Sequence, residues 1–82
     1  MDFEYGTILE SFVRDRNKAL FSLNEKKIRI FCTQYGIELA SDAISFWGGV
    51  YKSILHIPSA PEELRVRSRE WLKDHNLSES IS

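Results

Sequence analysis

Four segments of the chain carry apolar residues at the three- and four-residue spacing that places them on one face of an α-helix. The segments cover residues of about 7–21, 25–35, 42–56 and 60–75. The alternating stretch Ile37-Glu38-Leu39 has no second strand with which to pair, so it predicts an extended connection. The first helix has two candidate starts, at Asp2 or at the Gly6-Thr7 pair.

The second segment has the clearest helix ends. Asn24 can cap it, because an asparagine side-chain oxygen accepts from the free amides of a first turn. Gly36 can end it, since glycine adopts the left-handed conformation at little cost. At the start of the third segment, Ser41 and Asp42 are both candidate caps.

The fourth segment carries signals at both ends. Ser59 and Glu62 have the Ser-x-x-Glu spacing of a capping box, which predicts a helix from about residue 60. At the other end, Asn76 is a candidate left-handed residue, and Leu77 can make the apolar contact that often accompanies such a helix end.

The third segment is apolar around most of its circumference, which is typical of a helix buried on nearly every side. Its apolar residues are Ala43, Ile44, Phe46, Trp47, Val50, Tyr51, Ile54 and Leu55. We therefore expect an all-α fold, a compact bundle of four short helices with the third helix central. Residues 1–77 are expected to form a single domain and residues 78–82 a frayed tail.

Length, charge and cysteine content limit the number of domains, the class of partner and the cellular compartment that we expect. With 82 residues the chain is too short for two ordinary domains, and its net charge of −1 lacks the positive excess typical of nucleic-acid-binding proteins. A single cysteine excludes an internal disulfide and fits a reducing cytoplasm. The acidic start predicts no signal peptide, and the apolar runs are too short and too interrupted to span a membrane.

The chain offers little for catalysis. Its two histidines, His56 and His75, do not stand at metal-ligand spacing from Cys32 or from each other. Cys32 lies on the apolar stripe of the second helix, where a small core residue is expected and not a nucleophile. We therefore expect no catalytic residue, no metal site and no cofactor.

The Gly48-Gly49 pair is the most unusual feature of the sequence, because two glycines inside a helix cost roughly 2 kcal/mol relative to alanines. Three interpretations are open: another helix of the same domain crosses closely there, a partner or a second copy docks there, or the helix breaks. The docking interpretation predicts a partner-binding stripe of small and polar residues: Ser45, Gly48, Gly49, Lys52 and His56.

Trp47 and Trp71 allow two interpretations. Tryptophan is enriched at the centres of protein interfaces, but each of these residues lies on the apolar face of its helix, which favours a place in the core.

Basic residues cluster in the first, second and fourth helices, where they are candidates for phosphate contacts. Acidic residues are interleaved with them, which is typical of a solvated face with local ion pairs. The candidate nucleic-acid contacts are Arg14, Lys18, Lys26, Lys27, Arg29, Arg65 and Arg69.

Three stretches resemble a family of small proteins of unknown function from Firmicute bacteria and their phages and prophages. They are Phe12-Val13-Arg14-Asp15-Arg16-Asn17-Lys18-Ala19-Leu20, Phe46-Trp47-Gly48-Gly49-Val50-Tyr51-Lys52 and Arg67-Ser68-x-x-Trp71-Leu72. The second stretch is the most specific, although relatives are expected to carry alanine near Gly48 and histidine in place of Tyr51. The resemblance implies a phage-related origin, and it favours a protein that modulates a host protein, including inhibitors of bacterial defence systems.

The sequence thus predicts a non-enzymatic protein–protein interaction module whose partner is a host protein or a second copy of the chain. The alternative is a small DNA-associated regulator that uses the basic residues of the first, second or fourth helix.

Overall fold

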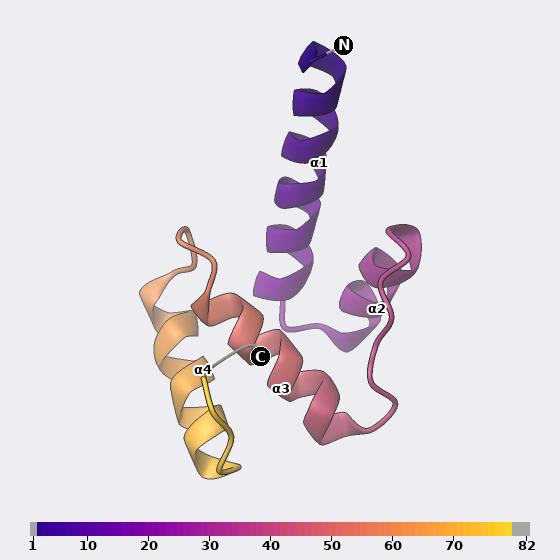
Figure 1. The fold of residues 1–82 in the computed structure, drawn as a ribbon. Coiled ribbons are helices and arrows are strands. Elements are labelled where there is room, and N and C mark those ends of the chain that lie inside the picture. Colours follow the sequence, from indigo (N-terminus) through magenta and orange to yellow (C-terminus); the bar gives the residue numbers. More distant parts are fainter. Residues whose placement is uncertain (1, 80–82) are drawn as a thin grey trace. The chain divides into compact units, whose positions relative to one another are not determined.

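The computed structural model describes the backbone of residues 2–79 and the side chains of residues 9–79. It contains four helices: α1 (Asp2–Phe21), α2 (Glu25–Gln34), α3 (Ala43–Leu55) and α4 (Glu62–Asp74) (Figure 1). Within the described residues no strand is present, and the predicted all-α fold class is confirmed. No helix in this part of the chain has both the length and the apolar character needed to cross a membrane.

Two helix starts differ from the prediction. Helix α1 begins at Asp2, the earlier of the two candidate starts, and not near residue 7. Helix α4 begins at Glu62 with Pro61 as its N-terminal cap residue, so Ser59 is not the cap. The reason is that the residue before a proline is held out of the helical conformation, which prevents Ala60 from opening the helix.

The chain divides into two compact units, Met1–Ile37 and Glu38–Ser82, which we describe separately. The first unit contains α1 and α2, and the second contains α3 and α4. The organisation into a single domain stays a prediction.

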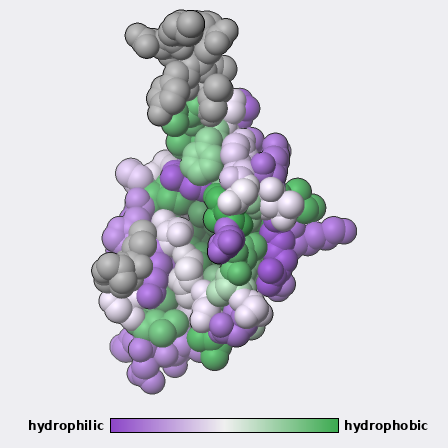
Figure 2. All heavy atoms as spheres, turned by 45° about the vertical axis from the view of Figure 1, so that its right-hand side comes forward, coloured by the Kyte–Doolittle hydropathy of each residue, from purple (hydrophilic) through white to green (hydrophobic). Residues whose placement is uncertain are grey.

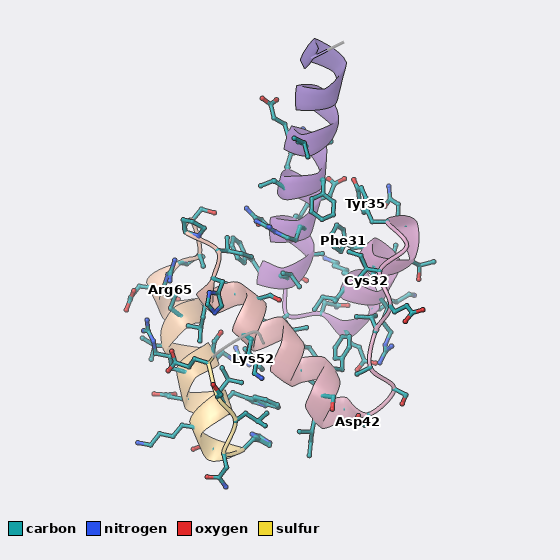
Figure 3. All side chains as sticks on the ribbon, in the orientation of Figure 1. Phe31, Cys32, Tyr35, Asp42, Lys52 and Arg65 are labelled. Carbon is teal, nitrogen blue, oxygen red and sulfur yellow. The ribbon has the colours of Figure 1, made fainter. Side chains whose placement is uncertain are left out.

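In the first unit, α2 packs against α1 through aromatic rings. The ring of Phe12 on α1 lies 5.7 Å from Phe31 and 5.0 Å from Tyr35, measured between centroids. Phe31 and Tyr35 lie on the side of α2 that faces α1 (Figure 3). The Tyr35 hydroxyl donates a hydrogen bond of 2.8 Å to Oδ2 of Asp15 on α1, which fixes the register of the two helices.

The ends of α2 confirm the sequence interpretation. Oδ1 of Asn24 accepts from the Lys27 amide at 3.0 Å. At the other end Gly36 has a φ of +68°, and the Ile37 amide donates to the Cys32 carbonyl at 2.8 Å, which closes the helix.

In the second unit, α3 and α4 pack against each other through a set of buried side chains. Ile54, Ser68 and Leu72 are fully buried, and the Ser68 hydroxyl donates to the Leu64 carbonyl at 2.6 Å. Helix α3 is not buried on nearly every side, as its apolar circumference predicted, because Ala43 and Ile44 are exposed. Among the described side chains it still contributes more buried residues than any other helix. They are Phe46, Gly48, Val50, Tyr51 and Ile54.

Arg65 ties the connection between α3 and α4 to the start of α4. Its guanidinium donates to the backbone carbonyls of Leu55, Ile57, Pro58 and Ala60 at distances between 2.6 and 3.2 Å. These carbonyls have few partners in a short irregular connection, so the arginine satisfies groups that a helix end leaves free.

The C-terminal end of α4 turns the chain back over the second unit. Asn76 adopts a φ of +56°, and the Leu77 amide donates to the Leu72 carbonyl at 2.8 Å. The prediction of Asn76 as the left-handed residue after α4 is therefore confirmed. The turn carries residues 77–79 towards α3, where they contact the candidate site described next.

Candidate functional site

The predicted partner-binding stripe lies along α3. Ser45, Gly49 and His56 are exposed and Lys52 is half-buried, so these four residues occupy the solvent side of the helix. Gly48 is buried and faces α4 and the returning C-terminal segment. The structure thus separates the two adjacent glycines, because neighbouring residues on a helix point about 100° apart.

Gly48 has an internal reason to be glycine. A Cβ atom on Gly48 would lie 3.2 Å from Cδ1 of Leu77 and 3.8 Å from Cζ3 of Trp71. Of the three interpretations of the glycine pair, internal close packing therefore accounts for Gly48. A Cβ atom on Gly49 would meet nothing within 4 Å, so no internal contact accounts for that residue.

The chain's own C-terminal segment covers one end of the stripe. Leu77 lies over Gly48, and Nε2 of His56 lies 3.1 Å from the Glu79 carbonyl, to which only its N–H can donate. The Glu79 carboxylate lies 4.0 Å from Nε of Arg69. Ser78 and Glu79 belong to the predicted frayed tail, whose residues 80–82 lie outside the described residues. Ser45 and Gly49, nearer the start of α3, are exposed.

A row of rings joins α3 to α4 beside this stripe. The Trp47 and Tyr51 rings lie 5.9 Å apart, Tyr51 and Trp71 5.1 Å, and Trp71 and His75 3.9 Å in a stacked pair. Tyr51 is buried, His75 is exposed, and both tryptophans are half-buried. Each tryptophan therefore packs in the core and also reaches solvent, and both interpretations stay open.

Ile44 extends this row at the first turn of α3, one helical turn before Trp47, and 54% of its surface is exposed. We call the set Ile44, Trp47, Trp71 and His75 the aromatic edge. Figure 2 shows that apolar side chains reach the surface among polar ones. The sequence groups Ile44 with the apolar residues of α3 and does not distinguish it from the buried ones.

The seven candidate nucleic-acid contacts fall on both units. The guanidinium of Arg65 is used by the α3–α4 connection, and Arg29 pairs with Glu25 at 2.7 Å. Arg14 lies 3.8 Å from Asp15, and Arg69 4.0 Å from Glu79. The remaining three are the exposed lysines Lys18, Lys26 and Lys27 of the first unit.

The chemistry of Cys32 disfavours a nucleophilic role. The thiol is buried, and this burial raises its pKa, while the charge of Arg29 acts in the opposite direction. A raised pKa lowers the thiolate fraction at neutral pH, and the thiolate is the reactive form. Within the described part of the chain, no group of three or more histidine, cysteine or acidic side chains is placed to hold a metal ion.

Comparison of the chain with protein-family models, with curated proteins and with solved structures finds no match.

Proposed function

We propose that this chain is a non-catalytic protein-binding module and that the aromatic edge is its principal contact surface. The half-exposed pair Trp47 and Trp71 is the observation that carries the proposal. Tryptophan contributes a large contact area with few rotatable bonds, and interface hot spots are enriched in it. The buried Tyr51 ring packs against both tryptophan rings, so the surface is preorganised before a partner binds.

Ile44 adds apolar area to the aromatic edge, and His75 adds a polar group. An isoleucine with 54% of its surface exposed leaves apolar area in water that a partner would remove. His75 stacks on Trp71 and donates from Nδ1 to the Trp71 carbonyl at 2.9 Å, so its Nε2 adds a polar group at the rim. An apolar centre with a polar rim is the usual composition of a protein interface.

The resemblance to small phage and prophage proteins supports a protein of the bacterial host as the partner. We propose that the chain modulates or inhibits that protein in the host cytoplasm, with a component of a defence system as the preferred candidate.

The alternative of a DNA-associated regulator has weaker support. Four of its seven candidate residues already lie in hydrogen bonds or ion pairs, namely Arg14, Arg29, Arg65 and Arg69. These interactions compete with phosphate contacts, so the three lysines of the first unit carry most of the alternative.

A comparative capture experiment tests the proposal. Tagged wild type is incubated with a lysate of a Firmicute host beside two full-length variants, Ile44→Ser and Val66→Ser. Val66 is the matched control, because it is an exposed aliphatic residue of the same unit (43% against 54% for Ile44) on the outer side of α4. We expect the wild type and Val66→Ser to retain one common protein and Ile44→Ser to lose it.

Equal retention by all three proteins would contradict the aromatic edge as the site. The exposed part of the predicted stripe is tested in the same assay by Gly49→Leu, whose Cβ atom would meet nothing within 4 Å. Loss of the captured protein in this variant would extend the interface from the edge to Ser45 and Gly49. Circular dichroism of each variant separates loss of binding from loss of fold.

A further inference from the structure

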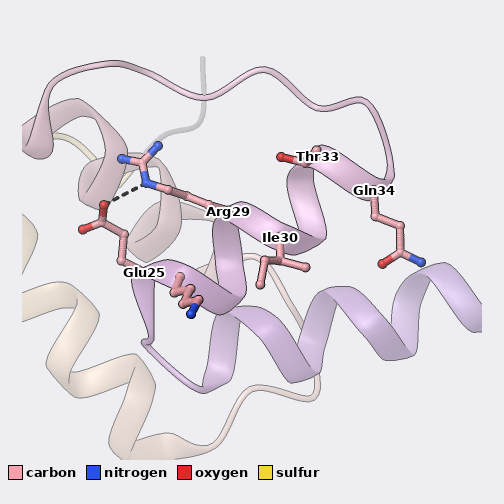
Figure 4. Close-up of a pocket in the computed structure, with 6 residues that line it drawn as sticks. Glu25, Arg29, Ile30, Thr33 and Gln34 are labelled. Atoms are coloured by element: carbon pink, nitrogen blue, oxygen red, sulfur yellow. Dashed lines mark hydrogen bonds and ion pairs between the residues drawn. The ribbon is translucent and has the colours of Figure 1, made fainter.

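The most exposed of the large apolar side chains that the structure describes belongs to the first unit. It is Ile30 on α2, with 57% of its surface exposed. Two adjoining depressions share this side chain. One runs along the outer face of α2 (Figure 4), and its lining residues are Glu25, Lys26, Arg29, Ile30, Thr33 and Gln34. The other lies between α1 and α2, where Lys18 and Ala19 of α1 meet Lys27 and Ile30 of α2.

The charge around Ile30 is positive. Lys26 and Lys27 stand four and three residues before it on α2, and Lys18 faces it across the groove from α1. In the part of the chain that the structure describes, none of these three lysines takes part in an ion pair. The result is an apolar centre with three unpaired ammonium groups at its rim.

The nearby carboxylates are already engaged and do not cancel this charge. Oε2 of Glu25 lies 2.7 Å from Nε of Arg29, which neutralises both (Figure 4). Asp15 accepts the hydrogen bond of Tyr35 and lies 3.8 Å from Arg14. Arg14 and Arg29 therefore hold the acidic groups of this region, and the lysines remain for an external anion.

We propose that the groove around Ile30 docks an acidic helical segment of a partner protein that carries an aliphatic side chain. The aliphatic side chain would pack on Ile30, and carboxylates on either side of it would face Lys18, Lys26 and Lys27. A groove between two helices with an apolar floor accepts an amphipathic helix in this way. This surface lies on the first unit and the aromatic edge on the second, so either can hold when the other fails.

Charge complementarity favours a protein segment over nucleic acid. A phosphate backbone would use the lysines but would leave the exposed Ile30 against a charged, hydrated strand, with no apolar partner to cover it. An acidic helix with one aliphatic residue satisfies both halves of the surface. The Ile30 contact adds affinity, and the lysines give orientation and a fast association rate.

The test uses the full-length protein and a synthetic probe. The probe is a fluorescein-labelled amphipathic peptide of about four helical turns, with leucines on one face and glutamates elsewhere. Its control replaces every leucine by serine and keeps the charge. Binding is followed by fluorescence anisotropy at low salt. We expect the wild type to bind the leucine peptide and to lose affinity as salt is added, because the lysines supply attraction that salt screens.

Two variants and two controls locate the contact. Ile30→Ser is expected to weaken binding by roughly tenfold, and the double change Lys18→Ala with Lys27→Ala by a similar factor with a shallower salt dependence. The matched controls are Val66→Ser, an exposed aliphatic residue, and Lys73→Ala, an exposed lysine. Both lie on the second unit and are expected to bind as the wild type does.

Four outcomes would overturn the inference. They are unchanged binding of Ile30→Ser, equal binding of the serine peptide, lysine-dependent binding of a duplex oligonucleotide that is tighter than that of the leucine peptide, and self-association through Ile30. The last is recognised as a dimer mass in light scattering that Ile30→Ser abolishes. Binding that is lost in Ile30→Ser and kept in Val66→Ser assigns the peptide to the first unit, which keeps this result separate from the proposal about the aromatic edge.

Discussion

Leu77 lies directly over Gly48, with its Cδ1 atom 3.2 Å from the place where a Cβ atom on that glycine would stand. The contact joins the end of the described chain to the middle of α3, and it gives the two adjacent glycines different roles. Gly48 makes room for a returning side chain, whereas Gly49 faces free space.

This difference predicts that alanine substitutions at the two glycines change the free energy of unfolding by different amounts. Gly49→Ala is expected to raise the free energy of unfolding by about 1 kcal/mol, because alanine is the better helix former and nothing obstructs its methyl group. Gly48→Ala gains the same propensity but pushes against Leu77, so its net gain is smaller or negative. Urea denaturation of both variants checks this, and equal gains would show that Leu77 does not occupy the site.

Arg65 is expected to be a stabilising residue of the second unit. Arg65→Met removes the donors to four carbonyls and should lower the free energy of unfolding by about 2 kcal/mol. Arg65→Lys is expected to recover little, because an ammonium group lacks the planar fork of a guanidinium. The control is Arg67→Met on the exposed side of α4, which should change stability by under about 0.5 kcal/mol. A similar loss in both methionine variants would remove the structural role of Arg65.

The local chemistry of helix ends was predictable from the sequence, and the longer-range choices were not. Asn24, Gly36 and Asn76 act as predicted because a cap depends on a few neighbouring residues. The sequence places the start of α4 too early, because Pro61 restricts the residue before it and the helix begins only at Glu62.

The candidate site was only partly predictable, because it depends on contacts between residues far apart in the sequence. Helical spacing placed Ser45 and Gly49 on one side of α3, as the structure has them, but it did not separate Gly48 from Gly49. That separation depends on the turn after α4, which brings Leu77 back over α3. Ile44 belongs to the apolar pattern of its helix, and its exposure of 54% shows that this pattern alone does not decide which apolar residues are buried.

The cap of α3 predicts a pH dependence at the acidic end. Oδ2 of Asp42 accepts from the Ser45 amide at 2.8 Å, and this hydrogen bond holds the pKa of the Asp42 carboxyl below its ordinary value of 3.8. A lowered folded-state pKa means that the cap stabilises the fold fully above pH 3.8 and is lost as the pH falls through the folded pKa.

Asp42→Asn is the matched variant, because asparagine also caps but does not titrate. Denaturation curves of the two proteins measured on either side of that pH should differ only at the acidic end. A parallel fall of stability in wild type and Asp42→Asn would assign the acid sensitivity to other groups.

The bond between Tyr35 and Asp15 predicts a pH dependence at the alkaline end. The pKa of the Tyr35 hydroxyl is raised above its ordinary value of 10.0, first because the hydroxyl donates to Asp15 and then through burial and the charge of that carboxylate. A raised folded-state pKa means that the contribution is complete below pH 10.0 and is lost as the pH rises through the folded value. In Asp15→Asn the Tyr35 phenolate should therefore form at a lower pH, which is followed by its absorbance during alkaline titration. An alkaline titration curve of Asp15→Asn that superimposes on the wild-type curve would exclude the bond.

Binding through the aromatic edge can be measured directly, because both tryptophans of the chain, Trp47 and Trp71, belong to it. Full-length protein labelled with fluorotryptophan gives one fluorine resonance for each, and the unlabelled partner obtained by capture adds none. We predict that both resonances shift or broaden when the partner binds and that they keep their free positions when Ile44→Ser is used. Two unchanged resonances at saturating partner would show that the protein binds through another surface and would contradict the account.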